Sequence, residues 1–166
     1  MSNYFKFFFI VFFLYTNHQS ANEIILYADS ISYDSKENLI AKGNAKIISK
    51  NKIIISDLII YNKIDEKYLI PSEFSFKDEK NNYYYGSNGE FTSDLKKAEI
   101  SDVKLLLNDG SRIVGTSGLR DGNIDIIKKG SYTPCISKIK ISKFICPIWQ
   151  LEGEKIIHDS DKLFLY

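Results

Sequence analysis

An alternation of apolar and polar residues with a period of two is the feature that most constrains how this chain folds. In Leu39–Ser49 (LIAKGNAKIIS), the side chains of Leu39, Ala41, Ala45 and Ile47 fall on one side of an extended backbone, because successive side chains of a strand point to opposite faces. Charged and amide side chains fall on the other side. No segment keeps a 3.6-residue period beyond a few residues. The pattern therefore predicts strands rather than helices.

Polar breaks divide the rest of the chain into short segments. They recur about every ten residues, which is the rhythm of a many-stranded antiparallel protein. Ile, Val, Tyr and Phe dominate the segments between them, as is typical of strands. The breaks read DSKEN, SKNK, YNKIDEK, KDEKNN, TSDLKK, NDGS and RDGN. The sequence therefore predicts an all-β fold.

The length and charge of the chain limit the classes of function. Its 166 residues suffice for one domain with a real core, and a hydrophobic content of 44% excludes a disordered tail. A net charge of +1 gives no electrostatic basis for binding nucleic acid. No catalytic triad, paired carboxylate site or phosphate-binding loop stands out, so we expect neither an enzyme nor a cofactor.

The first 21 residues have the order of a secretory signal peptide. Met1–Lys6 is short and carries a positive charge, Phe7–Tyr15 is a compact apolar run, and polar residues follow before Ala21. The run is shorter than the roughly 20 apolar residues that span a bilayer. We expect residues 1–21 to direct export, with an uncleaved membrane anchor as the alternative. Either way the cysteines reach a compartment that permits disulfides.

A longer repeat accompanies the alternation. Ala28–Asp34 (ADSISYD) recurs 28 positions later as Ser56–Asn62 (SDLIIYN). Weaker echoes follow at Gly86–Asp94 and Gly115–Gly122, 29 positions apart. A repeat of this length predicts stacked β-hairpins, each of which buries its apolar face against its neighbours. The alternative is a β-sandwich whose antiparallel strands resemble one another by chance.

The scarce residue types gather in residues 131–159. This stretch holds both cysteines, Cys135 and Cys146, and the single tryptophan, Trp149. A structural zinc site needs about four Cys or His ligands, and only His158 is close in sequence, so we expect no metal. A nucleophilic cysteine needs a positioned histidine base, for which His158 offers no further catalytic context. In an exported chain, the two cysteines are best interpreted as disulfide candidates.

The first two repeats carry a specific resemblance. The frame ILYADSISYDSKENLIAKGNAKIISKNKIIISDLIIYN, which contains Gly43-Asn44, resembles the repeat of the OstA-like family. That family comprises periplasmic lipopolysaccharide carriers and the N-terminal domain of the outer-membrane assembly protein LptD. Lys63–Arg120 resembles it more loosely. Three later groups follow the order found in LptD rather than in the carriers: Tyr132-Thr133-Pro134-Cys135, Trp149-Gln150 and Ile157-His158-Asp159.

The resemblance implies a fold and a function. It implies a β-jelly roll of repeated antiparallel strands, open along one side, that holds acyl chains in an apolar interior. In the family, such a domain receives lipopolysaccharide from a periplasmic carrier by edge-strand addition. Here Glu23–Tyr33, which is apolar, lacks proline and has few charges, suits such an edge and is equally compatible with an internal strand. It then passes the lipid to an outer-membrane barrel plugged by a lipoprotein. We thus expect a periplasmic lipopolysaccharide-accepting domain associated with the outer membrane. The alternatives are a soluble periplasmic carrier and an exported β-repeat module without a transport role.

The expected organisation is a signal peptide (1–21), the OstA-like jelly-roll repeats (22–130) and a Cys- and Trp-containing end (131–166) that leads toward a barrel. No series of alternating barrel segments is present, so we expect a fragment, a truncated gene product or half of a split protein. In the family, the cysteine matching Cys135 bonds to the barrel. Without a barrel, the alternatives are a local bond to Cys146, worth about 2–3 kcal/mol, and two free thiols.

The inward residues of the first repeats are the candidates for a lipid groove. A strand with one apolar face must bury that face, and each methylene of an acyl chain that leaves water gains about 0.8 kcal/mol. These side chains can therefore pack against lipid as well as against one another. The lipid-groove candidates are Leu39, Ala41, Ala45, Ile47, Ile53, Ile55 and Ile59.

Overall fold

The computed structural model describes residues 23–134, 149–162 and 164–165. In these ranges the chain forms strands and connecting turns, and antiparallel pairing joins the strands into one continuous sheet. The prediction of an all-β fold is confirmed. No helix in the described ranges has the length and apolar character of a membrane span. The expected signal peptide (1–21) and both disulfide candidates, Cys135 and Cys146, lie outside the described residues.

Most strands are short, whereas β3, β4, β13 and β14 are markedly longer. The strands are β1 (Ile24–Tyr27), β2 (Ser30–Tyr33), β3 (Leu39–Ser49), β4 (Lys52–Asn62), β5 (Lys67–Ile70), β6 (Phe74–Lys77), β7 (Tyr83–Gly86), β8 (Asn88–Thr92), β9 (Lys97–Ser101), β10 (Lys104–Leu106), β11 (Arg112–Val114), β12 (Ser117–Asp121), β13 (Ile124–Thr133), β14 (Leu151–Asp159) and β15 (Phe164–Leu165).

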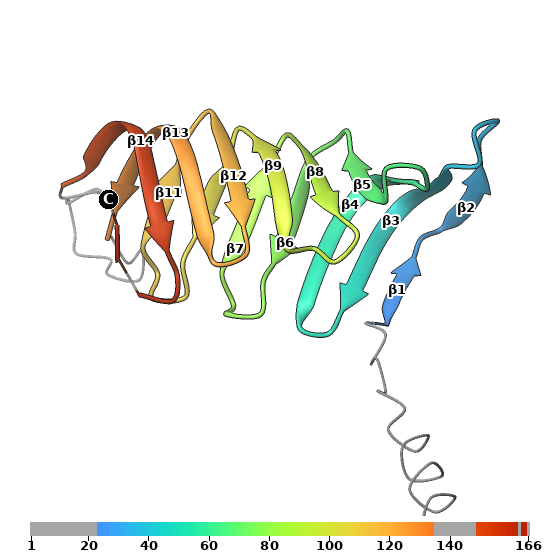
Figure 1. Ribbon diagram of the computed structural model, residues 1–166, viewed down its shortest axis with the longest axis horizontal. Coiled ribbons are helices and arrows are strands. Elements are labelled where there is room, and N and C mark those ends of the chain that lie inside the picture. The colour runs from blue at the N-terminus through green and yellow to red at the C-terminus, as the bar shows by residue number, and fades with distance from the viewer. Residues whose placement is uncertain (1–22, 135–148, 163, 166) are drawn as a thin grey trace, which may run out of the picture.

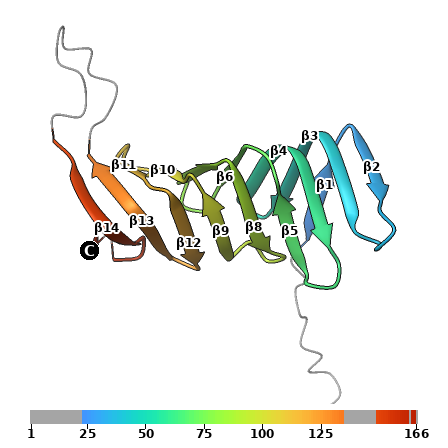
Figure 2. The same cartoon turned by 90° about the horizontal axis from the view of Figure 1, so that it is seen from above.

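The sheet folds over on itself into two layers, as in a β-jelly roll (Figures 1 and 2). Half-sheet one contains the short strands β1, β6, β7, β10 and β11. Half-sheet two contains β2, β5, β8, β9 and β12. The long strands β3, β4 and β13 are paired with both layers. The result is an elongated shell in which each hairpin stacks on the next.

Short corners carry the chain from one layer to the other. Backbone hydrogen bonds continue through these corners: Ser87 N donates to Ser101 O at 3.1 Å, and Asp102 N donates to Thr116 O at 2.9 Å. The backbone polar groups of the corners therefore remain satisfied.

The core lies between the two layers. In β6, Phe74 and Phe76 are buried while Ser75 and Lys77 point outward, so the alternation of the sequence places the aromatic rings inside. Half-sheet one and the adjacent halves of the long strands contribute Ile47, Ile54, Phe74, Phe76, Tyr84, Leu105 and Ile113, and the opposite side contributes Ala41, Ile59, Tyr68, Ile70, Phe91, Ala98, Ile100 and Ile127.

The repeated sequence segments lie on strands that are separated by one intervening strand of the sheet. Ile31 of β2 and Ile59 of β4 both pair with Ala41 of β3. The later echoes behave in the same way, because Gly89 of β8 and Gly118 of β12 flank the same residue of β9. The repeated residues therefore occupy equivalent places in stacked hairpins.

Gly43 and Asn44 form a β-bulge at the point where β3 passes between the layers. The pairing of β3 with β4 shifts between Lys42 and Ala45, and φ is +75° at Gly43 and +47° at Asn44. Asp29 fixes this bulge: its N–H donates to Gly43 O at 2.9 Å, and its Oδ2 accepts from Asn44 Nδ2 at 2.9 Å. The Gly-Asn pair therefore supplies the two residue types that best tolerate a left-handed backbone.

Replacing Gly43 by alanine is expected to lower the free energy of unfolding by about 1–3 kcal/mol. The new Cβ would lie 2.5 Å from Asp29 Oδ2, in addition to the strain of a positive φ. Gly122→Ala is the matched control, because Gly122 has φ +60° and nothing within 4 Å of its Cβ position. Urea unfolding compares the two variants. Equal losses would contradict a structural role for the contact with Asp29.

Candidate functional site

The N-terminal end of the shell leaves inward-facing apolar side chains uncovered. Ile31 and Tyr33 lie directly opposite Ala41 and Leu39, on the inner face, yet they are 50% and 71% exposed. Within the described residues, β1 and β2 pair only with β3, so their outer edges present free backbone groups. This open end, at the right of Figure 1, combines an exposed apolar interior surface with unpaired strand edges.

Five of the predicted groove residues face the interior, as expected. Ala41, Ala45, Ile47 and Ile59 have no exposed surface, and the partly buried Leu39 packs against the same core. Their inward orientation is confirmed, whereas their contact with lipid stays a prediction.

The expected inward orientation of Ile53 and Ile55 is wrong. Ile54, between them, is fully buried, and neighbours on a strand point to opposite faces. Ile55 is 47% exposed on the outer face. The cause is the bulge at Gly43, which shifts the pairing of β4 by one residue. The inward set that includes Ile59 therefore continues to Ile54 rather than to Ile55.

Aromatic side chains fill the middle of the shell. Phe76 is fully buried, and its ring centroid lies 5.4 Å from that of Tyr84 and 5.3 Å from that of Phe91. Phe74 occupies the space that a side chain at Gly89 would need, because a Cβ there would lie 2.8 Å from its ring. An apolar ligand therefore finds accessible surface at the N-terminal end rather than in the middle of the shell.

Hairpin turns meet along the side of the shell opposite the corners. Lys52 donates from Nζ to Leu95 O, 3.3 Å away in the turn between β8 and β9, and burial lowers the pKa of Lys52. Leu95 is 1% exposed and has φ +54°, so this turn inserts an apolar side chain into the core. A cavity of about 220 Å³ between the turns has charged walls that include Lys50 and Glu79. This side of the shell is therefore polar at its surface and apolar below.

A buried network of charged residues lies inside the shell near its C-terminal end. Arg120 Nη2 donates to Asp78 Oδ2 and Arg120 Nη1 donates to Asp125 Oδ1, both at 3.2 Å. The Tyr84 hydroxyl accepts from Arg120 and donates to Asp125 Oδ2 at 2.9 Å. His158 Nδ1 lies 3.0 Å from the same oxygen. The charged side chains are at most 7% exposed, so the network ties β7, β12, β13 and β14 together away from water.

The surroundings of Tyr84 and Arg120 shift the pKa values of these two groups. Burial, followed by the charge of Asp125, raises the pKa of Tyr84 well above its usual value, so the hydroxyl keeps the proton that it donates. Burial acts to lower the pKa of Arg120, but Tyr84, Asp125 and Asp78 outweigh it and raise that pKa. The sequence reasoning missed this network. Within a single strand, the sequence indicates this network only through Asp125, a charged residue at a position of β13 that faces the interior.

The two sides of the C-terminal sequence signature meet where β13 ends and β14 begins. The ring centroids of Tyr132 and Trp149 lie 6.2 Å apart, and Thr133 Oγ1 donates to Trp149 O at 3.1 Å. Within residues 23–134 and 149–162, no group of three or more His, Cys, Asp or Glu side chains is placed to hold a metal ion. The pairing of Cys135 and Cys146 stays a prediction.

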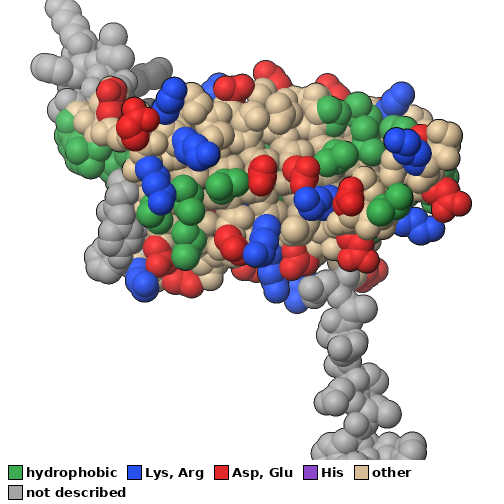
Figure 3. All heavy atoms as spheres, turned by 45° about the horizontal axis from the view of Figure 1, so that its top comes forward, with side chains coloured by type: hydrophobic (Ala, Val, Ile, Leu, Met, Phe, Trp, Pro, Cys, Tyr) green, Lys and Arg blue, Asp and Glu red, His purple; other side chains and the backbone are tan. Residues whose placement is uncertain are grey.

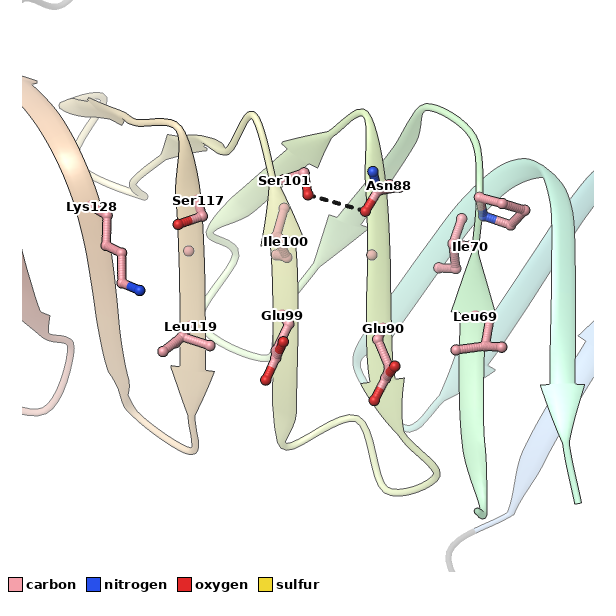
Figure 4. A pocket seen from close by; sticks show the side chains of 13 residues that line it. Leu69, Ile70, Asn88, Glu90, Glu99, Ile100, Ser101, Ser117, Leu119 and Lys128 are labelled. Carbon is pink, nitrogen blue, oxygen red and sulfur yellow. Dashed lines mark hydrogen bonds between the residues drawn. The ribbon is translucent and has the colours of Figure 1, made fainter. Parts of the chain in front are cut away.

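A shallow hollow of about 510 Å³ lies on half-sheet two (Figure 4). Glu90 of β8 and Glu99 of β9 lie directly opposite each other there, and Leu69 and Leu119 flank them. Lys67 forms an ion pair with Glu90. The hollow is thus a mixed polar surface, unlike the apolar open end of the shell.

No family model matches the sequence, and no curated protein matches it either. Among solved structures, the fold is similar to that of LptH from Pseudomonas aeruginosa, described as the LptA-homologous periplasmic component of the lipopolysaccharide transport device. The TM-score is 0.49 with 13% sequence identity, over 87% of this chain and 81% of that chain.

Proposed function

We propose that this chain is a non-enzymatic, exported β-jelly roll that accepts the acyl chains of lipopolysaccharide at its open N-terminal end. The observation that supports this most directly is the exposure of Ile31 and Tyr33 on the inner face. An acyl chain that covers them continues the apolar core outward, and each methylene removed from water contributes about 0.8 kcal/mol. The polar headgroup remains in water beyond the edge of the strands.

The free edges of β1 and β2 suit a partner that supplies a strand. An unpaired strand edge accepts an extended segment of another chain through backbone hydrogen bonds, and both strands pair with β3 alone among the described strands. The proposed partner is a periplasmic lipopolysaccharide carrier, whose last strand would lengthen the sheet and align the two apolar interiors. Lipid then passes between the proteins without crossing water.

We assign the acceptor role of the LptD type rather than that of a free carrier on the C-terminal signature. Two parts of this signature make separate contacts in the shell: Tyr132 packs against Trp149, and His158 contacts Asp125, a residue outside the signature, in the buried network. These contacts stabilise β13 and β14 at the C-terminal end of the shell. We propose that a connection to an outer-membrane barrel and its plug lipoprotein begins there. The proposed location is therefore the periplasm, next to the outer membrane.

Site-specific photo-crosslinking tests this function. A photoreactive amino acid at Tyr33 or Ile31 is expected to form an adduct with lipopolysaccharide, because both side chains line the open interior. Leu119 is the matched control, since it is 39% exposed but points outward on half-sheet two. The absence of adducts at both inner positions, or equal adducts at Leu119, would contradict the proposal.

A further inference from the structure

A row of outward side chains crosses half-sheet one from β1 to β11. It consists of successive cross-strand partners, which share one face of a sheet. The row begins with Tyr27, Lys46 and Ile55, passes through Ser75, and continues with Tyr85, Lys104 and Val114. Tyr27 is 54% exposed, Ile55 47%, Tyr85 42% and Val114 43%. Large apolar side chains and lysines therefore alternate along one outer surface.

A second row runs beside the first. It begins with Ile25, Ile48 and Ile53 on β1, β3 and β4. It continues through Lys77 and Tyr83 to Arg112 on β11. We call the surface made by these two rows the basic face.

Every charged side chain in the two rows is a cation. These are Lys46, Lys77, Lys104 and Arg112, and none of them takes part in an ion pair within the described residues. Lys77 Nζ lies 5.8 Å from the centre of the Tyr83 ring. Two acids, Glu73 and Asp102, line a cavity together with Lys104 at the corner of the shell. Neither belongs to the rows.

The outer face of half-sheet two is built differently. Its cations include Lys67, which binds Glu90, and Lys97, which binds Asp121 at 3.0 Å. Acidic and basic side chains are interspersed over the side of the molecule seen in Figure 3. Acids and cations therefore share the outer face of half-sheet two, whereas the two rows on half-sheet one carry only cations from β1 to β11. The first row meets an acid only where it continues through Ser131 of β13 to Glu152 of β14.

We propose that the basic face rests on the surface of a membrane that contains anionic lipids. Tyrosine rings occupy the headgroup region of bilayers, and lysine and arginine stems extend to the phosphates. Isoleucine side chains beside them enter the boundary of the acyl region. The unpaired cations are complementary to an anionic surface, each strengthening binding by about fivefold. This proposal concerns the surface opposite to the interior and goes beyond the acceptor role.

Vesicle sedimentation with the full chain tests the proposal. Vesicles of zwitterionic lipid alone are compared with vesicles that also contain an anionic phospholipid, at low and high salt. The wild-type chain is expected to bind the anionic vesicles more tightly, and added salt should weaken that binding. The apolar run Phe7–Tyr15 is common to all variants, so the difference between the two lipid compositions is the readout.

Two pairs of matched variants locate the contact. Lys104→Glu with Arg112→Glu should weaken binding to anionic vesicles at least tenfold, as expected from about fivefold for each cation. Lys128→Glu with Lys155→Glu changes the net charge equally on the outer face of half-sheet two, and should retain most of the binding. Tyr27→Ser with Ile55→Ser should also weaken binding, unlike Leu119→Ser with Ile124→Ser.

All substituted side chains are exposed, and unfolding midpoints confirm that the variants fold. Wild-type binding that is equal on both lipid compositions would overturn the proposal. Equal losses in the basic-face variants and their controls would also overturn it, because binding would then follow net charge alone. Binding that is unchanged in the basic-face variants would also overturn the proposal. An acidic protein would then be the alternative partner for this face.

Discussion

Replacing Arg120 by methionine is expected to lower the free energy of unfolding by about 3–5 kcal/mol, because removing one partner strands buried charges. Arg120 is the only cation that contacts both Asp78 and Asp125 within the described residues, and these carboxylates are 0% and 3% exposed. Without the guanidinium, both buried carboxylates lose the cation that compensates their charge. Urea unfolding of the variant, followed by circular dichroism, measures the loss.

Two comparisons show whether the loss comes from buried charge. Lys97→Met removes an ion pair with Asp121 whose side chains are 62% and 71% exposed, and it should cost less than about 1 kcal/mol. Adding Asp78→Asn and Asp125→Asn to Arg120→Met removes the stranded charges and should restore part of the stability. An Arg120→Met variant as stable as Lys97→Met would contradict the proposed role of the network.

Replacing Phe76 by alanine is expected to cost about 3–5 kcal/mol of unfolding free energy. The ring is fully buried between Tyr84 and Phe91, and the Arg120 guanidinium lies 5.7 Å from its centre. Its loss therefore leaves a cavity at the place where both layers and the buried network meet. Differential scanning calorimetry should show a lower melting temperature.

Tyr85→Ala is the control for Phe76→Ala. Tyr85 is an aromatic residue of β7, but it is 42% exposed on the outer face, so its removal leaves no enclosed cavity. We expect a loss below about 1 kcal/mol, as for most surface substitutions. Similar losses in the two variants would show that aromatic content, rather than interior packing, sets the stability of the shell.

The strands and their stacking follow from the sequence because both depend on local pattern. Alternation decides which side of a strand faces the core, as with Ala45 and Ile47. The repeat then places Ile31 and Ile59 on the same side of half-sheet two. The resemblance of the first repeats to the OstA-like frame added the open jelly roll, and the exposed inner face at β2 fits that expectation.

The orientation of Ile53 and Ile55 was not predictable from alternation. A run of three isoleucines is compatible with either face, so the pattern leaves the choice between Ile54 and its neighbours to the pairing partner. That choice is made at the bulge of Gly43 and Asn44, on another strand. The sequence of β4 itself does not indicate which of the three isoleucines faces the core.

The buried network was missed for a different reason. Asp78 lies in a turn, and Tyr84, Arg120, Asp125 and His158 lie on four separate strands. Each polar residue, taken alone, is typical of a turn or a solvated strand face. Only the stacking of the rungs brings them together, so the network depends on the tertiary arrangement.

The pairing of β1 and β2 with β3 alone has a consequence for cooperativity. In a shell where each rung contacts its neighbours, local stability is graded along the long axis rather than shared equally. The first rung, β1 and β2, can detach and pair again while the aromatic centre stays folded, because its ladder hydrogen bonds are made to β3 alone among the described strands. The end at which we propose that another chain docks is thus also an end that can rearrange without unfolding the aromatic centre.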